Sequence, residues 1–228
     1  MNDPKTRTIQ TDYLARVEGE GAMRVVLENG DVSELELKIY EPPRFFEALL
    51  QGRAFGEAPD ITARICGICP VAYQTSAVLA MEDACGVTVP GPIQQLRRLL
   101  YCGEWLQSHG LHVYMLHAPD FLGYAGAVDM AGDHPEVVKR GLMIKKVGNE
   151  LMRVIGGRAV HPVNVKVGGF YRAPDVEELN ALRGDLEQAL AACVETVAWT
   201  AGFDFPELET DLELVALAGP NEYPIDRG

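Results

Sequence analysis

Two cysteines at C-x-x-C spacing, Cys66 and Cys69, constrain this chain more than any other feature of its sequence. That spacing can put two thiolates on one metal ion. Gly67 lets the backbone turn tightly between the cysteines, and Pro70 suits the first position of a helix predicted over residues 71–85. The thiols would then sit at a helix N-terminus, where the helix dipole and unpaired N–H groups favour the anionic, metal-binding form of sulfur.

The spacing alone leaves two other interpretations open and ranks them first. A C-x-x-C pair equally describes a thioredoxin-like redox couple, which predicts a metal-free protein with a reversible disulfide. It also describes half of a structural zinc site in a non-catalytic domain, completed by one or two of His109, His112 and Cys85. Metal analysis separates these interpretations from each other.

Composition narrows the expected partners and compartment. The chain has 228 residues, 47% of them hydrophobic, so it can bury a core as one large domain or two small ones. Its net charge of −13 repels nucleic acid and anionic membrane surfaces, and neither is an expected partner. The N-terminus has no apolar segment behind its charges, and no run of about eighteen apolar residues occurs, which together predict a cytoplasmic protein.

Residues 8–40 have the pattern of a small antiparallel sheet. Strands are predicted at residues 13–14, 23–27 and 32–39. A hairpin turn is predicted at Asn29-Gly30, and one face of the sheet is expected to be solvent-exposed. Two prolines end the sheet, and residues 44–51 predict a short helix.

Beyond the cysteines the pattern is helical, with breaks at residues 89–92, 118–119 and 156–157. The elements predicted between the breaks are a long buried helix, an amphipathic helix and a strand or extended loop, at residues 93–117, 136–155 and 158–172. Asp175 is predicted to cap a final helix with a buried apolar stripe. The fold class is therefore mainly α with a small N-terminal antiparallel β-sheet.

The five cysteines are odd in number and widely spread, which argues against a disulfide framework. Apart from the C-x-x-C pair, Cys85, Cys102 and Cys193 are expected to be core residues. Cys193 falls on the apolar stripe of the final helix.

Three regions are predicted from these patterns: the sheet and short helix at residues 1–60, a helical core carrying the cysteines at 61–201, and an acidic, proline-containing tail at 202–228. The helices are too apolar to be covered fully by one another. The chain is therefore expected to continue into a missing C-terminal half.

The residues around the cysteines, Arg-Ile-Cys-Gly-Ile-Cys-Pro-Val-Ala-Tyr-Gln from Arg64, resemble the N-terminal metal-binding motif of nickel-iron hydrogenase large subunits. Other matching stretches are Arg-Val-Glu-Gly from Arg16, a histidine-containing region at 108–120 and Gly-Arg-Ala-Val-His-Pro from Gly157. The resemblance rests on the order and approximate spacing of these stretches relative to Cys66. The chain resembles the N-terminal half of such a subunit, of the cytoplasmic, multi-subunit, NAD(P)-linked and sulfhydrogenase-like kind.

The resemblance implies a nickel-iron centre held by four thiolates, which are soft ligands that suit these metals. Cys66 would be a terminal nickel ligand and Cys69 would bridge nickel to iron. The iron would carry cyanide and carbon monoxide, and the other cysteine pair would come from the missing C-terminal half. Glu18 would pass protons between a cysteine at the centre and the outside, a role suited to a buried carboxyl of raised pKa.

Other residues are assigned around the centre by the same resemblance. Arg64, Tyr73 and His109 would lie near it, with Tyr73 standing where many relatives have a histidine that hydrogen-bonds a cysteine sulfur. Glu47 matches a residue that supplies a carboxylate to a separate magnesium or similar ion. His109 and His112 share a helix face and could form a metal pair, although histidines bonded within a packed core are the more ordinary interpretation.

The implied reaction is the reversible heterolytic splitting of H2, in which a terminal cysteine thiolate takes the proton and passes it to Glu18. Electrons would leave through iron-sulfur clusters on a partner small subunit toward NAD(P)-reductase subunits, since this chain has no cysteine set for such clusters. Sulfur reduction is a second activity of the subgroup. Without the second cysteine pair, the chain alone is expected to be inactive.

Overall fold

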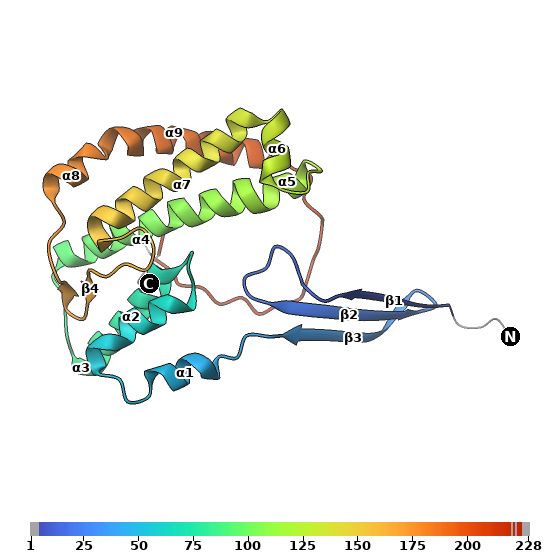
Figure 1. Ribbon diagram of the computed structural model, residues 1–228, viewed down its shortest axis with the longest axis horizontal. Helices are drawn as coiled ribbons and strands as arrows, with labels where there is room; N and C mark the ends of the chain where they lie inside the picture. Colours follow the sequence, from blue (N-terminus) through green and yellow to red (C-terminus); the bar gives the residue numbers. More distant parts are fainter. Residues whose placement is uncertain (1–4, 220, 222, 225–228) are drawn as a thin grey trace. The chain divides into compact units, whose positions relative to one another are not determined.

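The computed structural model describes residues 5–219, 221 and 223–224, which form two compact units. The N-terminal unit extends to Ala48, and the helical unit begins at Leu49 (Figure 1). The boundaries predicted from sequence at residues 60 and 201 remain predictions. Among the described residues, no helix is both long and apolar enough to cross a membrane.

The N-terminal unit is a three-stranded antiparallel sheet in the order β1-β2-β3, formed by Thr6–Thr11, Gly21–Glu28 and Asp31–Ile39. The predicted hairpin turn is confirmed, with φ angles of 56° at Asn29 and 102° at Gly30. The strand predicted at residues 13–14 is wrong. Strand β1 ends at Thr11. Positive φ angles at Arg16 and Gly19 then turn the following segment away from the strand direction.

The sheet is also more exposed than expected. β2 buries Ala22 and Val26, but β3 is exposed along its whole length. Helix α1 (Arg44–Leu50) follows, as predicted for residues 44–51.

The helical unit contains most of the secondary structure. Its elements in chain order are η1 (Phe55–Glu57), α2 (Ala58–Thr62), η2 (Ala63–Ile65), α3 (Pro70–Cys85), α4 (Gly91–Leu111), the π-helix η3 (His112–His117), α5 (Ala118–Phe121), α6 (Ala127–Asp133), α7 (Pro135–Gly156), β4 (Val165–Lys166), β5 (Gly169–Phe170), α8 (Val176–Ala181) and α9 (Arg183–Thr200). The predicted fold class is therefore confirmed. The predicted helix over 71–85 is also confirmed, with Pro70 in its first turn and Gly86 ending it at φ 64°.

Two helix predictions need correction. The helix expected over 93–117 changes at His112 into a π-helical turn. The final helix is divided at Leu182, although its Asp175 cap is confirmed by hydrogen bonds from the N–H groups of Glu177 and Glu178.

The apolar stripe predicted for the final helix is mostly exposed. Leu190, Val194 and Val197 point away from the core, whereas the small residues Ala189 and Ala192 are buried. The small side chains of Ala189 and Ala192 allow α9 to pack closely on α7, and the larger apolar side chains on its other faces are exposed to solvent. The prediction of core cysteines also fails in part, because Cys85 is exposed while Cys102 and Cys193 are half-buried.

Helices α4 and α7 lie side by side through closely approaching backbones (Figure 1). A Cβ atom on Gly148 would lie 2.5 Å from the backbone nitrogen of Gln107 and 2.6 Å from the carbonyl oxygen of Gly103. A Cβ on Gly141 would collide with the ring of Tyr114. Glycine spacing along both helices thus allows a contact that no larger residue permits.

A buried ion pair ties this helix pair to α3 and the β4–β5 hairpin. Arg97 on α4 donates two hydrogen bonds, of 2.9 and 2.7 Å, to the carboxylate of Glu82 on α3. The guanidinium also donates to the carbonyl of Lys166, and Glu82 accepts from the N–H of Gly168. Because the charges are paired and further hydrogen-bonded, their burial is tolerated.

The Gly148→Ala substitution is expected to destabilise the chain by about 1–3 kcal/mol, because its methyl group would meet backbone atoms that cannot move aside. Urea unfolding followed by circular dichroism measures the effect. The matched control is Gly184→Ala on α9, where an added Cβ meets no described atom within 4 Å. That control is expected to be neutral or stabilising by up to about 1 kcal/mol, and equal effects at both glycines would contradict the close-approach interpretation.

Candidate metal centre

The two cysteines lie in a short loop between η2 and α3. Their Cα atoms are 5.4 Å apart, and their sulfur atoms lie next to each other, joined in a disulfide. The N–H of Cys69 donates a hydrogen bond of 3.1 Å to the sulfur of Cys66. The turn does not depend on Gly67 for conformational freedom, since this glycine is not in the left-handed region and a Cβ there would meet no described atom within 4 Å.

A buried carboxylate from α4 caps the helix that follows the cysteines. Glu104 accepts hydrogen bonds of 2.5 Å from the N–H of Val71 and 3.1 Å from the N–H of Ala72. Only 2% of Glu104 is exposed, and this burial raises its pKa to about 7 against the lowering effect of the two N–H donors. The N–H groups of Val71 and Ala72 therefore donate to Glu104, and the sulfur of Cys66 accepts its backbone hydrogen bond from the N–H of Cys69.

A second side chain from α4 holds the loop between the cysteines. Gln107 is buried, and its Nε2 atom donates a hydrogen bond of 2.5 Å to the carbonyl oxygen of Ile68. Its Oε1 atom accepts from the ammonium group of Lys145 on α7 at 3.3 Å.

The segment after α7 supports the other side of the loop. The Nδ1 atom of His161 lies 2.8 Å from the carbonyl oxygen of Ala63, three residues before Cys66. His161 has a φ of 50°, an uncommon conformation for a residue with a side chain. The buried amide of Gln74 on α3 donates to the carbonyl of Pro162 at 2.9 Å. Contacts from α3, α4 and the 157–164 segment therefore fix the backbone around both cysteines.

Sequence reasoning missed Glu104 and Gln107. A long buried helix is predicted at residues 93–117 with no role assigned to Arg97, Glu104 or Gln107, yet all three are buried. Their spacings of seven and three residues put them on one face of the helix, and a charged and polar row at that spacing in an apolar helix was the available signal.

The other predicted site residues of the helical unit lie at different depths. Arg64 is exposed and lines a cavity of about 260 Å³ with Asp60, whose pKa is raised by burial despite Gln74 and Arg64. Tyr73 lies on α3 with 38% of its surface exposed. His109 packs on Trp105 with 5.2 Å between the ring centroids, and partial burial together with His112 lowers its pKa.

His112 contacts a histidine five residues further along the chain. The Nε2 atoms of His112 and His117 lie 3.2 Å apart. The cause is the π-helix, whose wider turn aligns residues five apart.

Glu18 and Glu47 belong to the N-terminal unit. Glu18 is exposed in the segment between β1 and β2, and Glu47 is exposed on α1. The burial expected for Glu18 is thus not found within the described residues. Their roles as proton carrier and magnesium ligand remain predictions.

Within the described part of the chain, the side chains at this site can supply two ligands to a soft or borderline metal ion and no more. Among the described residues, no group of three or more histidine, cysteine, aspartate or glutamate side chains could hold a metal ion. A zinc site completed by Cys85 is ruled out by distance, since α3 separates Cys85 from Cys69 by 16 residues, about 24 Å of helix. The reduced pair can serve as two thiolate ligands, and the bonded pair is also the form used by a thiol redox couple.

Comparisons with known proteins help to distinguish metal ligation from a thiol redox couple. The sequence model of one family, described as nickel-dependent hydrogenase, matches residues 44–139. The alpha subunit of sulfhydrogenase 2 from Pyrococcus furiosus is 47% identical over 174 residues, which cover 76% of this chain and 42% of that subunit. The beta subunit of the NAD-reducing hydrogenase HoxS from Cupriavidus necator is 31% identical over 72% of this chain and 36% of that subunit.

Solved structures agree with the sequence comparisons. An NAD+-reducing [NiFe]-hydrogenase in the H2-reduced state aligns with a TM-score of 0.80 and 33% identity over 86% of this chain and 45% of that chain. The Ni-Fe-Se hydrogenase of D. vulgaris Hildenborough aligns with a TM-score of 0.71 and 31% identity over 84% and 44%. The chain spans less than half of the length of each of these relatives.

The pKa of Glu104 gives a pH-dependent prediction. Because folding raises this pKa from 4.5 to about 7, the folded chain holds a proton that the unfolded chain releases in that interval. The contribution of Glu104 to stability is therefore full below pH 4.5 and decreases by roughly 3 kcal/mol as the pH rises through 7. The difference in unfolding free energy between the parent chain and Glu104→Gln, measured by urea titration across this range, should follow that decrease. Parallel pH profiles would contradict it.

Proposed function

Because the chain belongs to the nickel-dependent hydrogenase family, we propose that it is the N-terminal, cysteine-bearing part of the catalytic subunit of a nickel-iron hydrogenase. The proposed reaction is the reversible heterolytic cleavage of H2. The observation that carries the proposal is the Cys66–Cys69 loop, whose two sulfurs lie next to each other. Gln107 bonds the backbone of this loop, and His161 and Glu104 bond the backbone before and after it.

Cys66 and Cys69 would hold the metals, Cys66 as a terminal nickel ligand and Cys69 as the bridge between nickel and iron. When bound, such a centre polarises H2 and removes its electrons, and cyanide and carbon monoxide on the iron belong to the same proposal. The Cys66 sulfur, as a thiolate, can accept the proton that H2 releases. The N–H of Cys69 donates to that sulfur and would favour its anionic form.

Glu18 is proposed to receive the proton from the cysteine and exchange it with solvent. Its carboxylate is exposed in a segment that contains two positive φ angles, at Arg16 and Gly19, so the backbone fold of this segment is specified locally. Glu47 is proposed as one oxygen ligand of a magnesium or similar ion, for which a carboxylate is chemically suited.

Electrons are proposed to leave through iron-sulfur clusters on a partner small subunit. Such clusters usually need four cysteines, and apart from Cys66 and Cys69 the described cysteines are one exposed and two half-buried residues on three different helices. NAD(P)-reductase partners and an additional sulfur-reducing activity are proposed from the names of the relatives, one an NAD-reducing hydrogenase and one a sulfhydrogenase. A cytoplasmic location is part of the same proposal, and cell fractionation tests it.

Metal content separates this function from its alternatives. The complete protein that contains this chain, isolated anaerobically, is expected to hold nickel and iron, and Cys69→Ser is expected to lose both because it removes the bridging sulfur. Cys85→Ser, on the exposed end of α3, is the control and should keep both metals. Stoichiometric zinc, or a metal-free protein with a reversible Cys66–Cys69 disulfide, would instead favour the structural-zinc or thiol-oxidoreductase alternative.

The proton path is tested at Glu18. Glu18→Gln in the complete enzyme is expected to slow the exchange of D2 with solvent protons by about a hundredfold or more, since an amide cannot carry the proton. Nickel and iron contents should stay unchanged. Glu20→Gln, two residues away and also exposed, is the matched control. Full exchange activity in Glu18→Gln would eliminate this residue as the proton carrier.

A further inference from the structure

The side-chain amide of Gln107 connects the cysteine loop to a charge on a different helix. Its Nε2 atom donates to the carbonyl of Ile68, which lies between Cys66 and Cys69 in the sequence. Its Oε1 atom accepts from the Nζ atom of Lys145. Gln107 is buried, which limits the access of water to its amide, and Lys145 is half-buried.

Lys145 determines which end of the amide faces the loop. An ammonium group can only donate hydrogen bonds, so it selects the orientation in which Oε1 of Gln107 points toward α7. The NH2 group must then point the opposite way, where the Ile68 carbonyl needs a donor. The reversed amide would place Oε1 against that carbonyl, and two acceptors would face each other.

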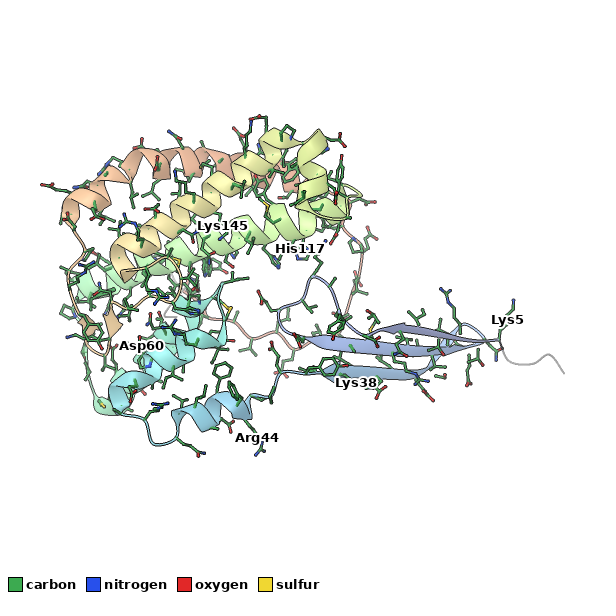
Figure 2. The ribbon with its side chains drawn as sticks, in the orientation of Figure 1. Lys5, Lys38, Arg44, Asp60, His117 and Lys145 are labelled. Atoms are coloured by element: carbon green, nitrogen blue, oxygen red, sulfur yellow. A yellow bond between two sulfur atoms is a disulfide. The ribbon has the colours of Figure 1, made fainter. Side chains whose placement is uncertain are left out.

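The close contact of α4 with α7 makes this geometry possible. Gly148, one turn after Lys145, would bring a Cβ within 2.5 Å of the Gln107 backbone nitrogen, and a Cβ on Gly110 would lie 3.3 Å from the backbone nitrogen of Lys145. The Lys145 side chain therefore starts from a backbone that touches α4 on either side of Gln107. Figure 2 labels Lys145 on α7, where that helix runs alongside α4.

We propose that Lys145 and Gln107 are positioning residues for the two metal-binding thiolates. Lys145 fixes the orientation of the Gln107 amide, and the amide fixes the peptide between the cysteines, which sets how closely the sulfurs are held. The inference rests on the proposed function for the identity of the metal ligands. The positioning itself is a property of the metal-free chain and can be measured there.

Thiol–disulfide exchange measures how closely the loop holds its two sulfurs. Two molecules of glutathione reduce the Cys66–Cys69 disulfide to two thiols and are themselves oxidised to one glutathione disulfide. The equilibrium constant of this exchange reports the effective concentration of one protein thiol at the other. The experiment uses the full 228-residue chain at fixed pH, with Cys85, Cys102 and Cys193 replaced by serine in every sample.

Lys145→Met is expected to lower the effective concentration about tenfold, as loss of one charge-assisted hydrogen bond would. Lys145→Arg, which keeps a donor-only cation, should stay within about twofold of the parent. Lys146→Met removes the same charge from the exposed neighbouring position and should have no effect. Circular dichroism checks that each variant is folded.

A double-mutant cycle distinguishes positioning from a direct electrostatic effect. In a Gln107→Leu background, or Gln107→Met if the first variant does not fold, Lys145→Met should cause no further loss because its intermediary is absent. A Lys145 effect that persists in that background would overturn the inference, since the charge would then act through space. An unchanged equilibrium in Lys145→Met, or a loss in Lys145→Arg as large as in Lys145→Met, would also overturn it. None of these outcomes depends on bound metal, so each leaves the proposed hydrogenase function to its own tests.

Discussion

The hydrogen bonds from the start of α3 to the buried carboxylate of Glu104 are the contact on which the rest of the site depends. The first turn of a helix leaves N–H groups without partners, and Pro70 removes one of them. Glu104 takes the next two from a different helix. This fixes the direction in which the chain leaves Cys69, and hence where its sulfur lies. It also changes the electrostatics expected for the site, because the N–H groups that could have favoured thiolates are already used.

Glu104 can serve this purpose only because α4 is itself held in place. The α4–α7 contact includes Gly148, where an added Cβ atom would collide with the backbone of α4, so the two helices are in direct backbone contact there. The Arg97–Glu82 pair connects the same helix to α3 a second time. The packing of α4 therefore determines the backbone position near the cysteines. Gln107 of α4 donates to the carbonyl of Ile68 in the loop, and Glu104 accepts from the N–H groups of Val71 and Ala72.

Much of this fold could be predicted from the sequence, because local signals specify it. Pro70 and Gly86 delimit α3, Asn29-Gly30 sets the hairpin, and Asp175 caps α8. The flanks of Cys66 and Cys69 indicated the correct family. The unpredicted parts depend on which neighbour a residue meets. Neither the partner of Glu104 nor the alanine face of α9 can be read from periodicity, and the π-helix that pairs His112 with His117 has no clear sequence signal.

The central claim is that both sulfurs of the Cys66–Cys69 loop ligate nickel. X-ray absorption at the nickel edge of the complete protein, isolated anaerobically, tests it most directly, because the spectrum reports which elements surround the metal. The account predicts sulfur neighbours around nickel in the parent protein, and a weaker sulfur contribution or loss of nickel in Cys66→Ser. Nickel surrounded only by nitrogen and oxygen, or a spectrum unchanged by Cys66→Ser, would contradict it.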